Sequence, residues 1–276
     1  MSDTYQHPNW DRNMTGVQNA LDYNVAGEPA LRVLANLNGW GIQVSNGEIE
    51  GVSYIEKFGR QKDITNGTLA TLWDGVDLYQ YLTVPSVLTV TSDSGDDSPT
   101  GPGAQTIEVQ GLDADYNPIT ETITMGSTGT LEFLRVFRAK VATAGSYGTN
   151  WGNISIDDGT NVAIIDGGPN NGPGVGQTFM ALYTVPAGKT AYLTQWAVSS
   201  GKQNADTLAT FVVRPFGGAF NTKDVVEIQA NNYIKEYKVP LKFEEKTDIE
   251  VRAYSDNGSS AASTFNLILI DNPVEE

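Results

Sequence analysis

The sequence predicts an all-β protein of two tandem β-sandwiches, preceded by an extended N-terminal arm with at most one short helix. From about residue 52 onward, short β-branched and aromatic segments alternate with turn residues, a pattern typical of β-sandwiches. At residues 167–176, nine of ten residues are Gly, Pro or Asn, which separates two such series. We therefore expect a docking arm at 1–50, an acidic sandwich at 51–166, a linker at 167–176 and a second sandwich at 177–276, both jelly-roll or immunoglobulin-like.

The arm is rich in Asn, Asp and Gly, and only residues 28–37 look helical. Pro29 suits a first helical turn, leucines recur at three-residue spacing, and Asn38-Gly39 supplies a stop. A segment this small cannot bury its own apolar side chains, so we expect it to lie on the rest of the chain or on a neighbouring subunit. The predicted partner-binding residues of the arm are Trp10, Leu31, Leu34, Leu37 and Trp40.

Each predicted sandwich follows from its own series of strands. In the first we expect strands at 86–90, 106–110, 119–125, 131–142, 153–157 and 162–165. In the second we expect them at 178–185, 190–198, 207–215, 225–230, 233–243, 248–254 and 263–270. Ile249, Val251 and Ala253 alternate with charged residues, which predicts one buried face and a charged face in water.

Composition excludes several chemistries. The 276 residues include no cysteine and one histidine, His7, so thiol nucleophiles, disulfides, thiolate metal sites and multi-histidine centres are excluded. With 33 acidic and 17 basic residues the net charge is −16, which opposes binding to nucleic acid or anionic membranes. We expect no signal peptide and no membrane span. Most carboxylates fall in turns or on charged strand faces, where water keeps them ionised, so we predict no catalytic residues, no cofactor and no enzyme. Calcium is the one metal that this composition allows, but the loop that begins at Asp113 has Pro118 and Thr124 where an EF-hand needs Gly and Glu, so we predict no metal.

Aromatic residues are the remaining candidates for a binding site. Trp196 lies in an apolar strand and is expected in the core. Many carbohydrate-binding modules stack sugars against exposed aromatic rings on the loops of a β-sandwich, and such rings also anchor protein interfaces. Tyr147 and Trp151 are therefore the residues expected to bind a glycan, if the protein is a binding module.

Several motifs together resemble a family of structural proteins from tailed bacteriophages, of the marine and freshwater, cyanophage-like kind. They are KFGRQKDI at 57–64, LWDG at 72–75, GPGAQTIEVQGLDADYN at 101–117, ITETI at 119–123, FLRV at 133–136, TAGS at 143–146 and ALYTVPAGKT at 181–190. The family usually has an acid-rich stretch after its Phe-Gly motif, whereas here Arg60 and Lys62 interrupt it.

This resemblance implies a non-enzymatic virion protein of tandem β-sandwiches, assembled in the bacterial host cytoplasm. Together with the arm, it leads us to expect a head decoration (cement) or head–tail junction (neck) component, docked through residues 1–50. The implied partners are the major capsid protein, the portal or connector, tail proteins, and further copies of itself in a homo-oligomer. One alternative is a tail-fibre receptor-binding or carbohydrate-binding module that uses Tyr147 and Trp151, and another is a depolymerase.

Overall fold

The computed structural model describes residues 21–23, 29–31, 39–169 and 172–273, and it forms two units, Met1–Ile49 and Glu50–Glu276. In the first unit, β1 (Leu21–Tyr23) pairs antiparallel with β2 (Pro29–Leu31), and α1 spans Trp40–Ser45. The helix expected at 28–37 is therefore wrong at its start, because Leu31 pairs with Leu21 across the β1–β2 hairpin. A single short segment gains little from helix formation, since nucleation is unfavourable.

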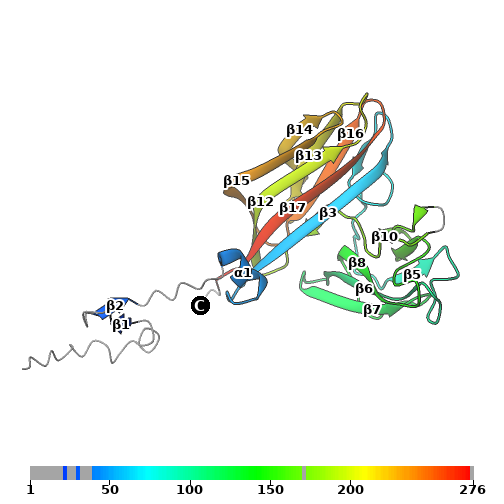
Figure 1. Cartoon of the computed structure of the whole chain (residues 1–276), viewed down its shortest axis with the longest axis horizontal. Helices are drawn as coiled ribbons and strands as arrows, with labels where there is room; N and C mark the ends of the chain where they lie inside the picture. The colour runs from blue at the N-terminus through cyan, green and yellow to red at the C-terminus, as the bar shows by residue number, and fades with distance from the viewer. Residues whose placement is uncertain (1–20, 24–28, 32–38, 170–171, 274–276) are drawn as a thin grey trace, which may run out of the picture. The chain divides into compact units, whose positions relative to one another are not determined.

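The second unit contains a larger and a smaller sandwich of antiparallel strands (Figure 1). One sheet of the larger sandwich has the order β15-β12-β17-β3, with β15 at Asn232–Phe243, β12 at Lys189–Ser200, β17 at Ser259–Asp271 and β3 at Val52–Ile64. The facing sheet has the order β11-β16-β13-β14, with β11 at Leu182–Thr184, β16 at Asp248–Ser255, β13 at Thr207–Arg214 and β14 at Asn221–Ile228. The short β4 (Leu69–Thr71) also pairs with β16, beside β11.

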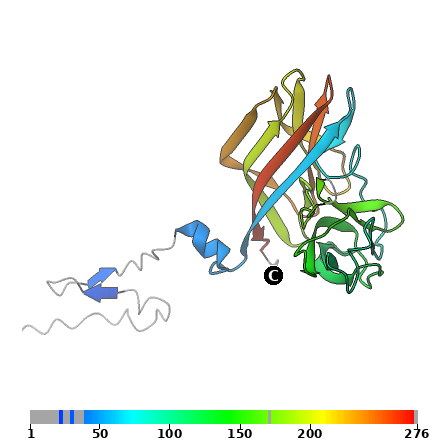
Figure 2. The same ribbon diagram turned by 45° about the vertical axis from the view of Figure 1, so that its right-hand side comes forward.

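The smaller sandwich consists of two three-stranded sheets, drawn in cyan-green and green in Figure 2. The first has the order β7-β6-β8, with β7 at Pro118–Thr124, β6 at Ala104–Leu112 and β8 at Arg135–Ala144. The second has the order β10-β9-β5, with β10 at Asn161–Ile165, β9 at Ile154–Asp157 and β5 at Thr89–Ser92. The all-β class with packed antiparallel sheets and one short helix is thus confirmed within the described residues.

Strands from the range 51–166, which we expected to form the first sandwich by itself, also pair with strands from the range 177–276. The range 51–166 contains β3 and β4, and these pair with β17 and β16 of the larger sandwich (Figure 1). The chain therefore starts the larger sandwich, builds the smaller one as an insertion, and returns at β11. The long β3 carried no strand signal because Lys57 and Gln61 occupy buried positions on it, where an apolar alternation would be expected.

Two short segments, 72–73 and 180–183, connect the sandwiches, and we call them the crossing segments. In the first, Leu72 packs into the larger core and Trp73 into the smaller one. In the second, successive side chains likewise pack into the smaller and the larger core in turn. The Ala181 N–H donates to Leu72 O at 2.9 Å, and Trp73 bridges to Met180. Because side chains alternate across a strand, one extended segment supplies residues to two cores at once.

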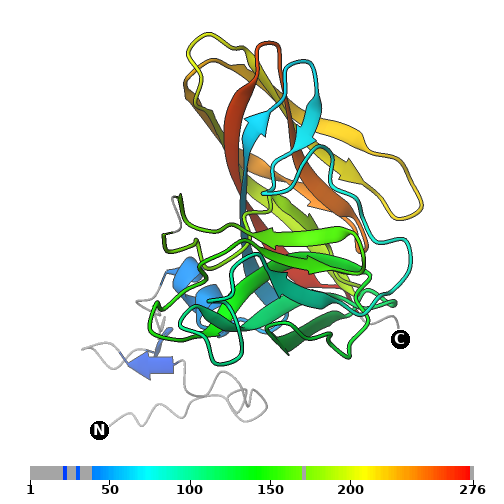
Figure 3. The same ribbon diagram turned by 90° about the vertical axis from the view of Figure 1, so that its right-hand side faces the viewer.

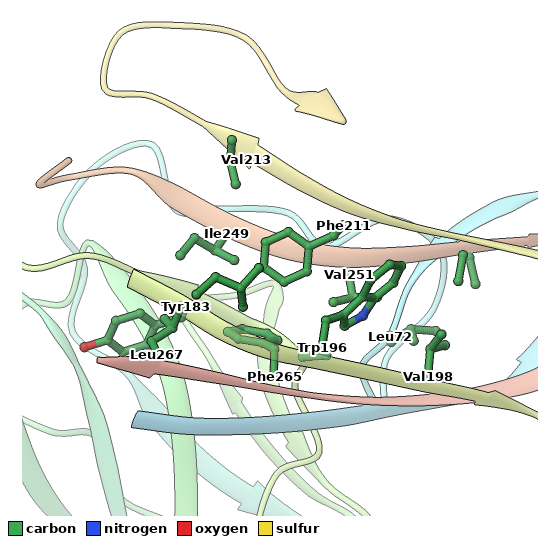
Figure 4. Close-up of a cluster of buried hydrophobic side chains, with 14 of the residues drawn as sticks. Leu72, Tyr183, Trp196, Val198, Phe211, Val213, Ile249, Val251, Phe265 and Leu267 are labelled. Atoms are coloured by element: carbon green, nitrogen blue, oxygen red, sulfur yellow. The ribbon is translucent and has the colours of Figure 1, made fainter. Parts of the chain in front are cut away.

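The larger core is built around aromatic rings, as the close-up in Figure 4 shows. Phe211 of β13 lies edge-on to Trp196 of β12, with centroids 5.8 Å apart, and to Phe265 of β17 at 5.4 Å. The indole N–H of Trp196 donates to the Ser263 hydroxyl at 3.0 Å, which satisfies the one polar atom of a fully buried ring. The core position expected for Trp196 is confirmed.

The charged face expected on β16 is not in water. Asp248 and Glu250 are 3% and 0% exposed, although Ile249, Val251 and Ala253 do face the core as expected. The smaller sandwich covers this side of β16: Arg135 Nε of β8 donates to Asp248 Oδ1 at 2.8 Å. The alternation of apolar and charged residues correctly separated the two faces of β16. It could not show that the charged face is buried, because the residue that covers it, Arg135, is 113 positions away from Asp248 in the sequence.

Candidate functional site

The predicted arm residues fall partly outside the described structure. Trp10, Leu34 and Leu37 lie outside the described residues, and Leu31 lies in β2. Trp40 is the first residue of α1 and is 54% exposed, and Ile42 in the same helix is 53% exposed. In this helix only Val44 is buried. The first unit therefore presents two large apolar side chains to solvent.

Tyr147 and Trp151, the residues expected to bind a glycan, are brought together by the loop that follows β8. Their ring centroids are 4.3 Å apart with an interplanar angle of 35°. The Tyr147 N–H donates to Pro102 O at 2.8 Å, and Gly148 adopts a positive φ of 71°, which allows the tight turn between the two rings. Tyr147 is 40% exposed, so the pair is accessible at the surface.

A buried carboxylate positions the backbone of Trp151. Asp97 Oδ1 accepts hydrogen bonds from the N–H groups of Trp151 at 2.9 Å and Ala104 at 2.8 Å. Asp97 Oδ2 accepts from the Gly152 N–H at 2.8 Å and the Ser92 hydroxyl at 2.7 Å. Asp97 is 6% exposed, so the expectation that water surrounds the carboxylates of the turns is wrong for this residue: four donors replace the water that a turn carboxylate would otherwise bind.

Trp151 lines a surface cavity of about 500 Å³. Asp93 and Asn153 form one side, where Asn153 donates through its backbone N–H and its side-chain amide to the Asp93 carboxylate, both at 2.8 Å. Gly167, Gly168 and Pro169, from the segment expected to be a linker, continue the wall next to Asn153, whose side-chain oxygen accepts a hydrogen bond from the Gly167 N–H at 2.8 Å. At Gly168 an added Cβ would lie 2.1 Å from Gly172 O, so this glycine-rich segment folds closely on itself.

Ion-paired side chains also line this cavity. Arg60 and Lys62 on β3 both bind the Asp166 carboxylate at 2.6 Å, and Arg60 also pairs with Asp74 at 3.0 Å. Burial raises the pKa of Asp74, and the adjacent Arg60 guanidinium opposes that shift. An aromatic platform beside carboxylate and amide groups provides stacking and hydrogen bonds together, which suits a polar ring such as a sugar.

The sequence pointed to Trp151, which lines this cavity, and to Tyr147, whose ring packs on it, but not to the polar groups of the cavity. Asp93, Asn153 and Asp166 come from three loops or strand ends that only the fold brings together. In the sequence, Arg60 and Lys62 differ from the acid-rich stretch usual in the phage family, and nothing there indicates that they line a cavity. The one usable signal was the Gly-, Pro- and Asn-rich segment directly after Asp166, since such segments often allow backbone to line a site.

Two further findings concern metals and membranes. Within the part of the chain that the structure describes, no group of three or more His, Cys, Asp or Glu side chains is placed to hold a metal ion. Across the same residues, no helix has the length and apolar character needed to span a membrane.

The similarities to known proteins are weak. No protein-family model matches the chain, and no curated protein matches it. A structure of infectious bursal disease virus, Gx strain, is 11% identical, covers 79% of this chain and 71% of that chain, and has a TM-score of 0.21. Infectious bursal virus-derived T=1 particles give 10% identity, 81% and 74% coverage and a TM-score of 0.18. The VP2 subviral particle of the same virus is 8% identical, covers 82% of this chain and 78% of that chain, and has a TM-score of 0.16. These neighbours are proteins of virus particles.

Proposed function

We propose that the chain is a non-enzymatic structural protein of a virion that binds other virion proteins through residues 1–50. The observation that carries the proposal is the exposure of Trp40 and Ile42, each more than half, on a six-residue helix. A helix of that length is not stable by itself, and large apolar side chains gain free energy when a partner buries them. The unit Glu50–Glu276, by contrast, has two cores of its own.

The specific role that we propose is a head decoration or neck component of a tailed bacteriophage. Its partners would be the major capsid protein, the portal or connector, or tail proteins, in a virion assembled in the bacterial cytoplasm.

We also propose self-association. Val225 on β14 and Ile234 and Val239 on β15 are 53%, 59% and 81% exposed, on strands at the free edges of the two sheets of the larger sandwich. Exposed apolar edge strands favour pairing with another chain.

Deleting residues 1–45 tests the docking role. We expect the truncated protein to keep its β-sheet circular dichroism and to lose incorporation into particles assembled in infected cells. A double variant, Trp40→Ser with Ile42→Ser, should lose incorporation in the same way, whereas Val239→Ser, which removes an exposed apolar side chain from β15, should keep arm-dependent docking. Normal incorporation of the truncated protein would contradict the proposal.

Copy number in purified virions distinguishes the two positions. Hundreds of copies, measured against the major coat subunit, would indicate decoration of the shell. About a dozen copies or fewer would indicate the neck or tail, where cyclic symmetry limits the number of subunits.

A second candidate function is carbohydrate binding, as in a tail-fibre receptor-binding module. The observation that favours it is the Tyr147–Trp151 ring pair beside a cavity of about 500 Å³ that also contains Asp93 and Asn153. Binding on a glycan array should be lost in Trp151→Ala and partly kept in Trp151→Phe. Tyr254→Ala, which removes a 38% exposed ring outside the cavity, should bind as the unmodified protein does. Release of reducing ends from a bound polysaccharide would indicate a depolymerase instead.

A further inference from the structure

A second cavity, of about 540 Å³, lies at the junction of the two sandwiches within the unit Glu50–Glu276. In Figure 3 the smaller sandwich, in cyan-green and green, lies in front of the lower part of the larger one. The volume of the cavity is within the range of about 300–1,000 Å³ that is usual for ligand pockets. Both sandwiches contribute its principal residues, which are Tyr81, Tyr116 and Arg135 from the smaller side and Arg214, Phe216 and Lys246 from the larger.

Rings and cations alternate along the wall of this cavity. The Arg214 guanidinium lies 4.7 Å from the centroid of Tyr81, and Arg135 lies 5.1 Å from the same ring. Arg135 and Lys246 then flank Tyr116, at 5.5 Å and 5.7 Å. The series continues at one end with Phe216, 5.3 Å from Lys246, and at the other with Phe220, 4.7 Å from Arg214. Cations held against ring faces are fixed in place.

The cations differ in how they are neutralised. Arg135 and Arg214 share the buried Asp248 carboxylate, and the Leu82 and Leu134 carbonyls accept two further hydrogen bonds from Arg135. Among the residues that the structure describes, Lys246 has no carboxylate within ion-pair distance. It is a half-buried cation, held between Tyr116 and Phe216, in a protein whose net charge is −16.

The cavity also has an exposed apolar rim. Phe216 is 65% exposed, in the loop 215–220 that joins β13 to β14. The fold does not need this ring in its cores, because Phe216 belongs to neither hydrophobic cluster. An exposed ring beside an unneutralised ammonium group is suited to a ligand with an apolar body and an anionic head.

We propose that this cavity binds an organic carboxylate with an aromatic or apolar body, whose head pairs with Lys246 and whose body packs on Phe216. A singly charged head fits better than a phosphate dianion, since Asp248 in the cavity wall adds a negative charge that repels a second one. This inference is independent of the proposed virion role. The carboxylate has two chemical sources, a free organic acid or an acidic side chain beside an aromatic residue in a polypeptide.

Titration calorimetry of the full chain at low salt tests the proposal with matched probes. Phenylacetate and its neutral counterpart phenylacetamide represent the free acid, and acetyl-Asp-Phe-amide and acetyl-Asn-Phe-amide represent a peptide. We expect at least one carboxylate probe to bind saturably in the millimolar range, about tenfold or more tightly than its amide counterpart. Binding of both acids, or of phenylacetate alone, identifies a free acid as a ligand. Binding of the aspartyl peptide alone identifies a polypeptide.

Two variants locate the binding. Lys246→Asn removes the charge and keeps a residue that tolerates the positive φ of 61° at this position, so we expect it to fold and to lose about tenfold or more in affinity. Phe216→Ser should also weaken binding, whereas Lys238→Asn, the same charge change on an exposed strand outside the cavity, should not. The proposal is overturned if neither carboxylate probe binds saturably, if the amides bind equally well, or if Lys246→Asn binds as the unmodified protein does.

Discussion

At the scale of single residues, the Asp97 carboxylate joins three segments of the smaller sandwich, at Ser92, at Ala104 and at Trp151 with Gly152. It accepts four hydrogen bonds, two of them from the backbone of Trp151 and Gly152. We expect Asp97→Asn to lower the unfolding free energy by about 2 kcal/mol or more, since one amide NH₂ would then face N–H donors. Urea denaturation measures this. Asp96→Asn in the same loop should change stability by less than about 0.5 kcal/mol, and an equal loss in both would contradict the role given to Asp97.

The buried Lys57 makes the free energy of unfolding depend on pH. Burial lowers the pKa of Lys57 well below its ordinary 10.5, and the positive charge of Arg138 lowers it further. Between that lowered pKa and 10.5, the unfolded chain holds one more proton than the native state, so the unfolding free energy rises with pH across this window. The slope from one proton reaches about 1.4 kcal/mol per pH unit.

The Lys57→Met variant checks this pH dependence. It lacks the titrating amine, so its unfolding free energy should rise less with pH below 10.5 than that of the unmodified protein. Lys238→Met, which removes an exposed lysine, should follow the unmodified protein. Urea denaturation at a series of alkaline pH values measures the difference. Parallel curves for Lys57→Met and the unmodified protein would show that Lys57 keeps an ordinary pKa in the folded state.

At the scale of elements, β3 depends on a glycine where it passes the crossing segments. A Cβ on Gly59 would lie 2.1 Å from Ala181 N and 2.3 Å from Leu72 O, both backbone atoms that cannot rotate away. We expect Gly59→Ala to cost about 1–3 kcal/mol or more in urea denaturation. Gly95 has open space where a Cβ would point, so Gly95→Ala is the matched control and should change little. Equal stability of the two variants would mean that β3 moves away without cost.

The same strand shows what sequence patterns reveal and what they miss. Period-two alternation found β16 and the core face of Ile249 and Val251, because those residues are apolar whatever covers the other face. It missed β3, whose buried face carries Lys57, Gly59 and Gln61. The Tyr147–Trp151 pair was predictable as exposed aromatic residues of one loop, and Trp151 of this pair lines the cavity. Its polar wall was not, since it depends on pairing between distant segments.

At the scale of the whole molecule, the two sandwiches share structure at the crossing segments. Residues 72–73 and 180–183 contribute side chains alternately to the larger and the smaller core. The buried Arg135–Asp248 ion pair, with an Nε–Oδ1 distance of 2.8 Å, also links the two modules. Unfolding one sandwich alone would expose half of each crossing segment to water and break this ion pair. We therefore expect the unit Glu50–Glu276 to unfold in one transition, although it contains two cores.

Matched core variants test this cooperativity. Ile156→Val in the smaller core and Ile249→Val in the larger core each remove one methylene group from a fully buried side chain, at a cost of about 1 kcal/mol. In one cooperative unit, either change should lower the midpoint of the same calorimetric transition by about 2–4 °C, with fluorescence and circular dichroism midpoints moving together. If the insertion folds independently, the melt should instead show two transitions, and each variant should move only its own. That outcome would mean that the crossing segments connect the sandwiches without coupling their stability.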